Sequence, residues 1–316
     1  MNDSDLGCIA LFGAAGAVGH ALSAALDRRG SQYRVVGRDL EKLRHEFPYV
    51  RCMRADFLSG EGVQEAAEAA DTIFYLAGAP YEHFERHPIM VRNALAAAQK
   101  AGVKRFIHIA PVYSYGPAAI RPVPESQPHE PNTRKGRWRL EQEQAVLDAG
   151  GKSGMRTAIV HLPDFYGPYA GNSLANYFIR EALQRKAATF IGPLDAQREF
   201  VYVPDVAEPL LAIAANEDVY GRCWNLGAVA PIRARDFTNL VYSQLGTKPN
   251  TRSVPKIALQ LFGLFNPSMR ELAEMYYLYD SDFILDDSAL NAKLGGLRKT
   301  PYETGVRDTL EWMKTH

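Results

Sequence analysis

Three glycines follow the first apolar run of the chain, Ile9–Phe12, at intervals of three residues. Gly13 permits a tight turn, Gly16 lets the backbone approach a pyrophosphate, and Gly19 lets a helix pack closely on a strand. The amino terminus of that helix supplies free N–H groups and the positive end of a dipole. A loop of this kind between a strand and a helix predicts dinucleotide binding. The loop residues expected to contact the dinucleotide are Gly13, Ala15, Gly16, Ala17, Val18 and Gly19.

The second apolar run ends in Gly37-Arg38 and indicates which dinucleotide binds. A site that prefers NAD places an acidic residue there, against the ribose 2′-hydroxyl. Here the end of the run, Val35–Arg38, holds no carboxylate, and the planar guanidinium of Arg38 can bind a 2′-phosphate through two hydrogen bonds. The alternative is a solvated surface arginine. We therefore expect NADP(H) in preference to NAD(H).

Strand-like and helical patterns alternate over the first hundred residues. Strands of this length separated by helices make right-handed parallel crossovers. The sequence therefore predicts an α/β fold with a doubly wound parallel Rossmann sheet and a smaller C-terminal substrate-binding lobe. The expected strands are 9–12, 33–36, 50–54, 72–76 and 105–109, and the expected helices are 17–29, 39–46, 61–70 and 88–101.

After residue 111 the alternation loosens, and a proline-rich loop over 111–133 is expected to cross the top of the sheet. We expect a Rossmann NADP-binding domain over 1–165, with contributions from 195–230, and mainly a substrate-binding lobe over 166–316. The apolar stretch 254–267 is too short to span a membrane. It predicts a helix buried in the second lobe or a dimer contact. The other expected elements are a strand at 156–161 and helices at 136–149 and near 173–187, 204–217 and 234–246.

Composition excludes several classes of partner. The 316 residues hold 36 Lys plus Arg and 36 Asp plus Glu, so the formal net charge is zero, whereas proteins that mainly bind nucleic acid or anionic membranes carry a basic excess. The cysteines Cys8, Cys52 and Cys223 are far apart, so we expect neither a disulfide framework nor a structural metal site. Without a signal-peptide pattern or a long apolar run, the expectation is a cytoplasmic protein.

Several later segments occur in an order that is specific to one family. Together with the glycine loop, they resemble the extended short-chain dehydrogenases, the epimerase/dehydratase group that acts largely on nucleotide sugars. The resemblance covers almost the whole chain. The segments are RADFLSG around Asp56, Leu76-Ala77-Gly78, Asp164-Phe165-Tyr166-Gly167-Pro168, residues 198–207, Trp224-Asn225-Leu226-Gly227 and the tail from Asp286.

The resemblance implies further cofactor contacts outside the glycine loop. It implies that Asp56 touches the adenine and that Leu76, Ala77 and Gly78 line the cofactor. Two helices of such proteins commonly form a dimer face, and the helices around 94–101 and 140–147 are compatible with a homodimer. The implied contacts are Arg38, Asp56, Phe57, Leu76, Ala77, Gly78, Lys135, Arg139 and Pro163.

The family's catalytic Ser, Tyr and Lys are replaced in this chain. The resemblance aligns Pro111 with the Ser, Lys135 with the Tyr and Arg139 with the Lys. Arg139 still offers donors to ribose hydroxyls. We expect the nearby arginines and burial to favour proton loss from Lys135, which would make it a proton donor. The alternative is that this basic cluster holds phosphate or ribose, or is a solvated helix face.

Other residues could complete the chemistry. Tyr113, Ser114 or Tyr166 could replace the missing hydroxyl, although a buried structural role is the better interpretation of each tyrosine. Asp164 could act as a base beside the nicotinamide, or could cap the following segment. A satisfied core histidine is the better interpretation of His161. The expected catalytic residues are Lys135, Tyr113 and Asp164, and the expected substrate contacts are Tyr113, Asp164, Tyr166, Asn172, Arg198 and Tyr202.

Three functions stay open for a protein with a small-molecule substrate. The first is an atypical NADP-dependent oxidoreductase or epimerase that acts on a nucleotide sugar or a small hydrophobic carbonyl compound. The second is a non-catalytic NADP(H)-binding redox sensor, because the catalytic triple is lost. The third is a cofactor-bound isomerase or lyase in which Asp164 or Lys135 acts alone.

Overall fold

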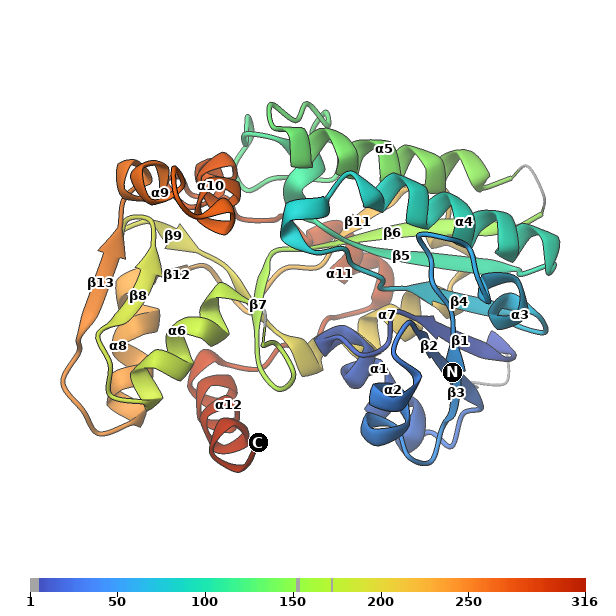
Figure 1. Cartoon of the computed structure of the whole chain (residues 1–316), viewed down its shortest axis with the longest axis horizontal. Coiled ribbons are helices and arrows are strands. Elements are labelled where there is room, and N and C mark those ends of the chain that lie inside the picture. Colours follow the sequence, from blue (N-terminus) through green and yellow to red (C-terminus); the bar gives the residue numbers. More distant parts are fainter. Residues whose placement is uncertain (1–5, 152–153, 172) are drawn as a thin grey trace.

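A seven-stranded parallel sheet forms the centre of the larger lobe (Figure 1). The computed structural model describes residues 6–151, 154–171 and 173–316. The strand order is β11-β6-β5-β4-β1-β2-β3, so the chain changes direction across the sheet between β1 and β4. Ligands of such sheets bind at this switch point, outside the carboxyl ends of the strands. The strands are β1 (Ile9–Phe12), β2 (Tyr33–Gly37), β3 (Arg51–Arg54), β4 (Thr72–Tyr75), β5 (Arg105–Pro111), β6 (Arg156–Leu162) and β11 (Cys223–Asn225).

Helices cover both faces of this sheet, as Figure 1 shows. One layer contains α3, α4 and α5, and the other contains α1, α7 and α11. Each helix buries one apolar stripe, as in α1, where Leu22, Ala25 and Leu26 are fully buried. The helices are α1 (Ala17–Arg28), α2 (Leu40–Glu46), α3 (Val63–Ala67), α4 (Arg86–Lys100), α5 (Arg134–Ala149), α7 (Ala207–Ala215) and α11 (Ser288–Leu294).

The smaller lobe consists of five helices and short strand pairs among the described residues. Its helices are α6 (Leu174–Leu183), α8 (Ala234–Gln244), α9 (Lys256–Phe262), α10 (Pro267–Glu274) and α12 (Tyr302–Thr315). The pairs are β7 (Asp164–Tyr166) with β10 (Phe200–Tyr202), β9 (Gln197–Arg198) with β12 (Ile232–Arg233), and β8 (Ala188–Ile191) with β13 (Thr251–Val254). Short 3-10 turns lie at η2 (Tyr81–His83), η3 (Val112–Tyr115), η4 (Val203–Val206), η5 (Glu217–Val219) and η6 (Tyr276–Leu278).

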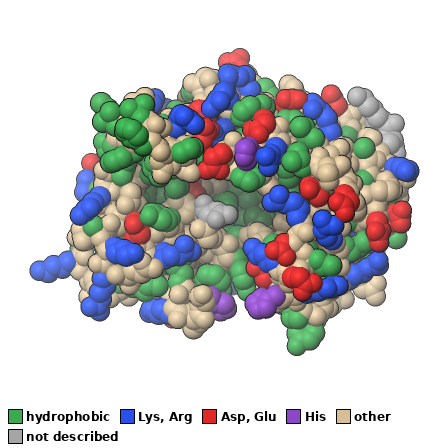
Figure 2. Space-filling model, viewed as in Figure 1, with side chains coloured by type: hydrophobic (Ala, Val, Ile, Leu, Met, Phe, Trp, Pro, Cys, Tyr) green, Lys and Arg blue, Asp and Glu red, His purple; other side chains and the backbone are tan. Residues whose placement is uncertain are grey.

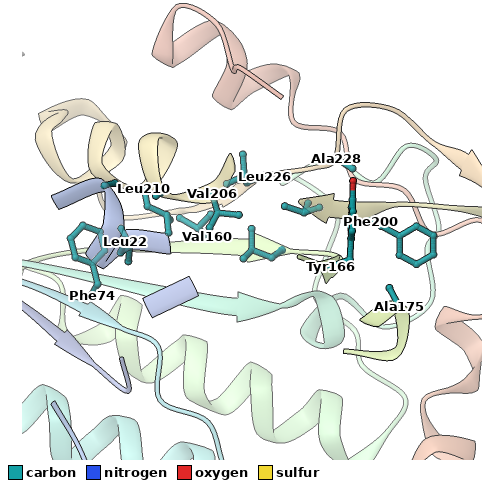
Figure 3. Packing of buried hydrophobic residues seen from close by; sticks show 14 of the residues in the cluster. Leu22, Phe74, Val160, Tyr166, Ala175, Phe200, Val206, Leu210, Leu226 and Ala228 are labelled. Atoms are coloured by element: carbon teal, nitrogen blue, oxygen red, sulfur yellow. The ribbon is translucent and has the colours of Figure 1, made fainter. Parts of the chain in front are cut away.

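One apolar core runs through both lobes. Leu22, Phe74 and Val160 of the sheet layer belong to the same buried cluster as Phe200 and Ala175 of the smaller lobe (Figure 3). A shared core of this kind fixes the position of one lobe against the other, because separating them would expose apolar surface to water. Side chains that line the space between the two lobes are therefore held at fixed distances from one another.

The fold class predicted from the sequence is confirmed, with local differences. The helix expected over 204–217 divides into the turn η4 and helix α7. The helix expected over 254–267 is present as α9. It is not buried in the second lobe, and the alternative of a dimer contact stays a prediction. Pro255 precedes the short helix α9, which buries Leu259 but leaves its neighbours exposed, and Pro267 begins α10. Figure 2 shows hydrophobic side chains gathered over α9 and α10. The exposed residues are Ile257, Leu261, Phe262, Leu264 and Phe265. Of the helices that the structure describes, none is long and apolar enough to cross a membrane.

Candidate active site

The glycine loop between β1 and α1 forms an open cradle of backbone N–H groups. Gly13 has a positive φ of 89°, and a Cβ added there would lie 2.5 Å from the Cα of Ala77. A Cβ on Gly19 would clash with the carbonyl oxygen of Ala14. At Gly16, the residue before α1, the nearest atom to an added Cβ is 3.9 Å away. Two glycines are therefore required by packing, whereas Gly16 leaves space in front of the helix amino terminus, which fits a pyrophosphate.

Arg38 lies directly after β2, at the edge of an open surface hollow of about 470 Å³ that Arg54 also lines. Asp39 is turned away to begin α2, because its carboxylate accepts a hydrogen bond of 2.9 Å from the Lys42 N–H. Arg54 pairs with Glu61 at 2.8 Å. In the described part of the chain the Arg38 guanidinium has no hydrogen-bond or ion-pair partner, so it remains available to an anion.

The remaining expected cofactor contacts lie along the same edge of the sheet. The Asp56 carboxylate accepts a hydrogen bond from the Leu58 N–H at 2.8 Å. The Phe57 ring is buried, 5.1 Å from the ring centre of Phe12, so this side chain belongs to the core and does not line the crevice. Leu76 and Ala77 follow β4 beside the glycine loop, and an added Cβ on the exposed Gly78 would meet nothing within 4 Å.

Two adjoining cavities lie where β5 and β6 end. The first, of about 130 Å³, is lined by Tyr113 and Asp164, with Pro111 and Pro163 beside them. The second, of about 450 Å³, lies in the smaller lobe and shares its lining with the first. Figure 2 shows the surface hollowed between the two lobes. The residues common to both cavities are Asp164, Arg198, Phe200 and Tyr279.

Asp164 lies between these cavities in an environment that favours its neutral form. Burial raises the pKa of Asp164 to about 6, although the Phe165 N–H and the Arg198 charge oppose the rise. The Phe165 N–H donates to its carboxylate at 2.9 Å. The Asp164 carboxyl group thus makes a local backbone contact and also lines both cavities. Such a group can exchange a proton close to neutral pH.

Tyr113 is the second titratable group of the first cavity. Burial raises the pKa of the Tyr113 phenol, and the Asp164 carboxylate adds to the rise, whereas the Arg139 charge opposes it. Its ring stacks at 5.9 Å on that of Phe84. The phenol therefore keeps its proton at neutral pH and can donate a hydrogen bond.

Arg139 is buried below this region, on α5. Its Nη1 donates to Oε1 of Gln142 at 2.7 Å, and its guanidinium lies 4.9 Å from the centre of the Phe84 ring. Burial lowers the pKa of Arg139 to about 10, so the side chain stays charged at neutral pH. Burial, and secondarily the Arg139 charge, lowers the pKa of His108 to about 3. Nε of Arg139 has no hydrogen-bond partner among the described residues.

Lys135 has carboxylates around it as well as the arginines near it in sequence. Arg134 lies 3.6 and 3.7 Å from the same two glutamates that Lys135 contacts. Its fully buried ammonium forms ion pairs with Glu271 and, at 3.1 Å, with Glu274, both on α10. It also lies 4.8 Å from the centre of the Tyr81 ring. Two carboxylates of α10 therefore face the Lys135 ammonium, and its role as a proton donor stays a prediction.

Three expected substrate residues do not meet at the cavities. Tyr166 is fully buried, and its ring packs 5.6 Å from Phe237 and 5.5 Å from Tyr202. Neither tyrosine lines the two cavities that contain Asp164. Both rings take part in packing, and substrate contact by Tyr166 and Tyr202 stays a prediction. Asn172 lies outside the described residues.

The sequence interpretation missed other lining residues. Glu199 lines the first cavity and accepts hydrogen bonds from the Ala228 and Leu285 N–H groups at 2.7 and 2.9 Å. Burial raises its pKa to about 7. Tyr279 lines both cavities, and Leu259 and Phe262 of α9 line the larger one. The apolar stretch around α9 was the available signal, although it predicted burial and not a cavity wall.

Comparisons with known proteins agree with this geometry. A family model described as the NAD dependent epimerase/dehydratase family matches residues 9–227. A trifunctional UDP-glucose 4,6-dehydratase/UDP-4-keto-6-deoxy-D-glucose 3,5-epimerase/UDP-4-keto-L-rhamnose-reductase of Arabidopsis thaliana is 24% identical over 96% of this chain and 47% of its own length. A 3beta-hydroxysteroid-dehydrogenase/decarboxylase of the same plant is 22% identical over 83% of this chain and 52% of its length. The chain thus spans about half of these relatives.

Solved structures share the fold over nearly the whole chain. A UDP-glucuronic acid 4-epimerase from Bacillus cereus in complex with NAD superposes with a TM-score of 0.82 at 17% identity, covering 98% of this chain and 99% of that one. A dTDP-glucose 4,6-dehydratase from Streptomyces venezuelae with NAD bound gives 0.81 at 18% identity, covering 98% and 97%.

Proposed function

Because the chain belongs to the NAD dependent epimerase/dehydratase family, we propose that it is an NADP(H)-dependent oxidoreductase for a small, largely apolar substrate. Hydride moves between the nicotinamide and a substrate carbon that bears a hydroxyl or carbonyl group. The observation that carries this proposal is the cavity at the carboxyl ends of β5 and β6. Tyr113 and Asp164 line it together, next to a larger apolar cavity.

The residues around the switch point support dinucleotide binding. The open N–H groups after Gly16 suit a pyrophosphate, and Arg38 and Arg54 flank a hollow that suits a ribose 2′-phosphate. Arg139 keeps a buried positive charge one helical turn from Lys135, where it can donate to ribose hydroxyls. When bound, the nicotinamide supplies the hydride donor or acceptor.

Asp164 and Tyr113 carry the proton chemistry in this proposal. During oxidation the Asp164 carboxylate would take the proton of the substrate hydroxyl, and a bound oxidised nicotinamide would accept the hydride from the carbon that bears this hydroxyl. During reduction the protonated carboxyl returns that proton to the carbonyl oxygen. The Tyr113 phenol donates a hydrogen bond to the same oxygen and stabilises the negative charge that develops on it. Lys135 acts here by joining α5 to α10.

The lining of the larger cavity favours an apolar substrate over a nucleotide sugar. Its described walls are mainly aliphatic and aromatic, and Arg198 is the cation among them. The Arg198 guanidinium already donates to the carbonyl oxygens of Leu278 and Ile191 at 2.7 and 2.9 Å. A nucleotide diphosphate would require free positive charge. A volume of about 450 Å³ suits a compact hydrophobic carbonyl compound.

Titration and turnover together test this function. The purified protein is titrated with NADPH and NADH, and oxidation of the reduced nicotinamide is then followed with hydrophobic carbonyl compounds and nucleotide sugars. We expect tighter binding of NADPH and turnover with the hydrophobic compounds. Tyr113→Phe is expected to slow turnover without weakening NADPH binding, and Tyr49→Phe, on a 98% exposed residue, is the control. Tight binding without any oxidation would favour the redox sensor.

A further inference from the structure

Four metal-ligating side chains from four separate segments meet at one edge of the sheet. They come from the proline-rich loop, α5, β6 and β11, and one ligand atom of each lies within 4.8 Å of the others. Figure 1 shows β11 beside β6, with α5 along them. Neither cavity that contains Asp164 is lined by these residues. The four are His129, Glu143, His161 and Cys223.

The strand register accounts for half of this arrangement. Cys223 of β11 pairs with Ile159 of β6, two residues before His161. Because alternate residues of a strand point to the same face, Cys223 and His161 share the face covered by α5. Glu143 projects from α5 onto this face, with Oε1 at 3.0 Å from Nε2 of His161. Its Oε2 lies 3.1 Å from Nδ1 of His129.

The four side chains are largely withdrawn from water. The side chains of His161 and Glu143 are 0% and 2% exposed, and that of His129 is 17% exposed. Nδ1 of His161 is buried and has no hydrogen-bond partner in the described part of the chain. A Glu143 carboxylate between two histidines explains three members of the cluster without an ion. It gives Cys223 no role.

The donor set matches zinc. Zn²⁺ takes four ligands from imidazole nitrogen, thiolate sulfur and carboxylate oxygen, at about 2.0–2.3 Å. Two donors of a tetrahedral site then lie about 3.4–3.7 Å apart, which the 4.8 Å spread accommodates after small side-chain movements. One thiolate, one carboxylate and two neutral imidazoles exactly offset the charge of a divalent cation, so the buried site is neutral overall.

We propose that His129, Glu143, His161 and Cys223 bind one structural Zn²⁺ ion. Four protein ligands leave no open position for a substrate, so the ion joins the proline-rich loop to the sheet and to α5. This site goes beyond the oxidoreductase chemistry and does not depend on it. His129 is 17% exposed, whereas Glu143 and His161 are almost fully buried.

Metal content and metal-dependent stability test the site. The full chain is purified without chelator, its zinc is counted by mass spectrometry, and the chelated protein is titrated with Zn²⁺ against a chromophoric competitor. Cys223→Ser is the main variant, and Cys52→Ser is its matched control, since Cys52 is similarly half-buried. His129→Gln is the second variant, and its control is His83→Gln, which also loses a histidine paired with glutamate.

We expect one zinc per chain and a rise in Tm when Zn²⁺ is added to the chelated protein. Cys223→Ser and His129→Gln are expected to weaken zinc binding at least about tenfold, and the two controls leave it unchanged. Co²⁺ in the wild-type protein should give a thiolate-to-metal absorption that Cys223→Ser removes. Zinc at background level with no change in Tm, or equal zinc affinity in Cys223→Ser and the wild type, overturns the proposal.

Discussion

Lys135 and Glu271 are 136 positions apart in the chain, and their ion pair joins α5 of the larger lobe to α10 of the smaller one. Glu274 adds a second carboxylate at 3.1 Å. The Lys135 side chain is fully buried, and the two glutamates are only 12% and 16% exposed. The pair therefore fixes the wall that carries Met269 and Leu272 over the larger cavity.

Replacing Lys135 by Met should destabilise the protein strongly. Glu271 and Glu274 would lose their buried cation and keep only exposed arginines such as Arg134, at 3.6 and 3.7 Å. Breaking a buried pair costs about 3–5 kcal/mol in the free energy of unfolding. Urea denaturation measures this. The triple variant Lys135→Met/Glu271→Gln/Glu274→Gln should recover much of the loss, and Lys42→Met, in an exposed pair with Glu46, should change little. An unchanged unfolding midpoint for Lys135→Met would contradict the structural role.

Asp164→Asn should remove a pH-dependent step from turnover. The carboxylate form is needed to accept a proton, so kcat/KM for oxidation in the wild type should rise as pH increases through about 6. The variant should lack this rise and lose about 10²–10⁴-fold in rate. Asp195→Asn, a surface carboxylate paired with Arg235, is the control. A variant that keeps the wild-type pH profile would exclude Asp164 as the base.

The same substitution should stabilise the fold at neutral pH. The pKa of Asp164 is raised in the folded protein, so the folded state binds more protons than the unfolded state between the ordinary value of 3.8 and about 6. Stability therefore falls as pH rises through this window. At pH 7 Asp164→Asn should gain about 1–2 kcal/mol, and below pH 4 the gain should vanish. Urea denaturation of the wild type and the variant at both pH values measures this difference in the free energy of unfolding.

Arg38→Ala should change the cofactor preference. Removing the guanidinium beside the surface hollow should weaken NADPH binding at least about tenfold and leave NADH binding nearly unchanged, because only NADPH carries the 2′-phosphate. Calorimetric titration with both cofactors gives the ratio. Arg44→Ala, on an exposed arginine that pairs with Glu41 on α2, is the matched control. If the ratio of NADPH affinity to NADH affinity is the same in Arg38→Ala as in the wild type, Arg38 does not bind the 2′-phosphate.

Two glycines of the first loop should respond differently to added bulk. Gly16→Val has space in this structure and should fold with an unchanged Tm, but its side chain would occupy the phosphate cradle and weaken dinucleotide binding at least about tenfold. Gly19→Ala should lower Tm, because its Cβ clashes with the Ala14 carbonyl. Thermal unfolding and NADPH titration of both variants separate the effects. Normal NADPH affinity in Gly16→Val would argue against a phosphate at this loop.

Local patterns predicted most of the fold. Short apolar runs, helical periodicity and the glycine spacing each depend on neighbours within a few residues, and the sheet followed from them. The position of Asp164 after β6 likewise placed it at the cavities. Partners distant in sequence were not predictable. Glu271 and Glu274 reach Lys135 across more than 130 positions, and nothing near Lys135 indicates them.

The sequence also did not predict which side chains next to the site are buried. Tyr166 and Asp164 belong to the same three-residue strand, yet one fills the core and the other faces a cavity. The orientation of so short a strand depends on its packing partners. The cluster around Glu143 was missed for a related reason, since each of its members is isolated in the sequence and only the pairing of β11 with β6 collects them.

The late position of β11 in the chain affects how the protein folds while it is being synthesised. β6 is complete at Leu162, but its partner strand begins at Cys223, after much of the smaller lobe has been synthesised. A nascent chain therefore carries β6 as an unpaired edge while about sixty further residues leave the ribosome, and such edges promote aggregation. A fragment ending near residue 165 would retain that edge permanently. The sheet of the larger lobe can therefore be completed only after much of the smaller lobe has been synthesised.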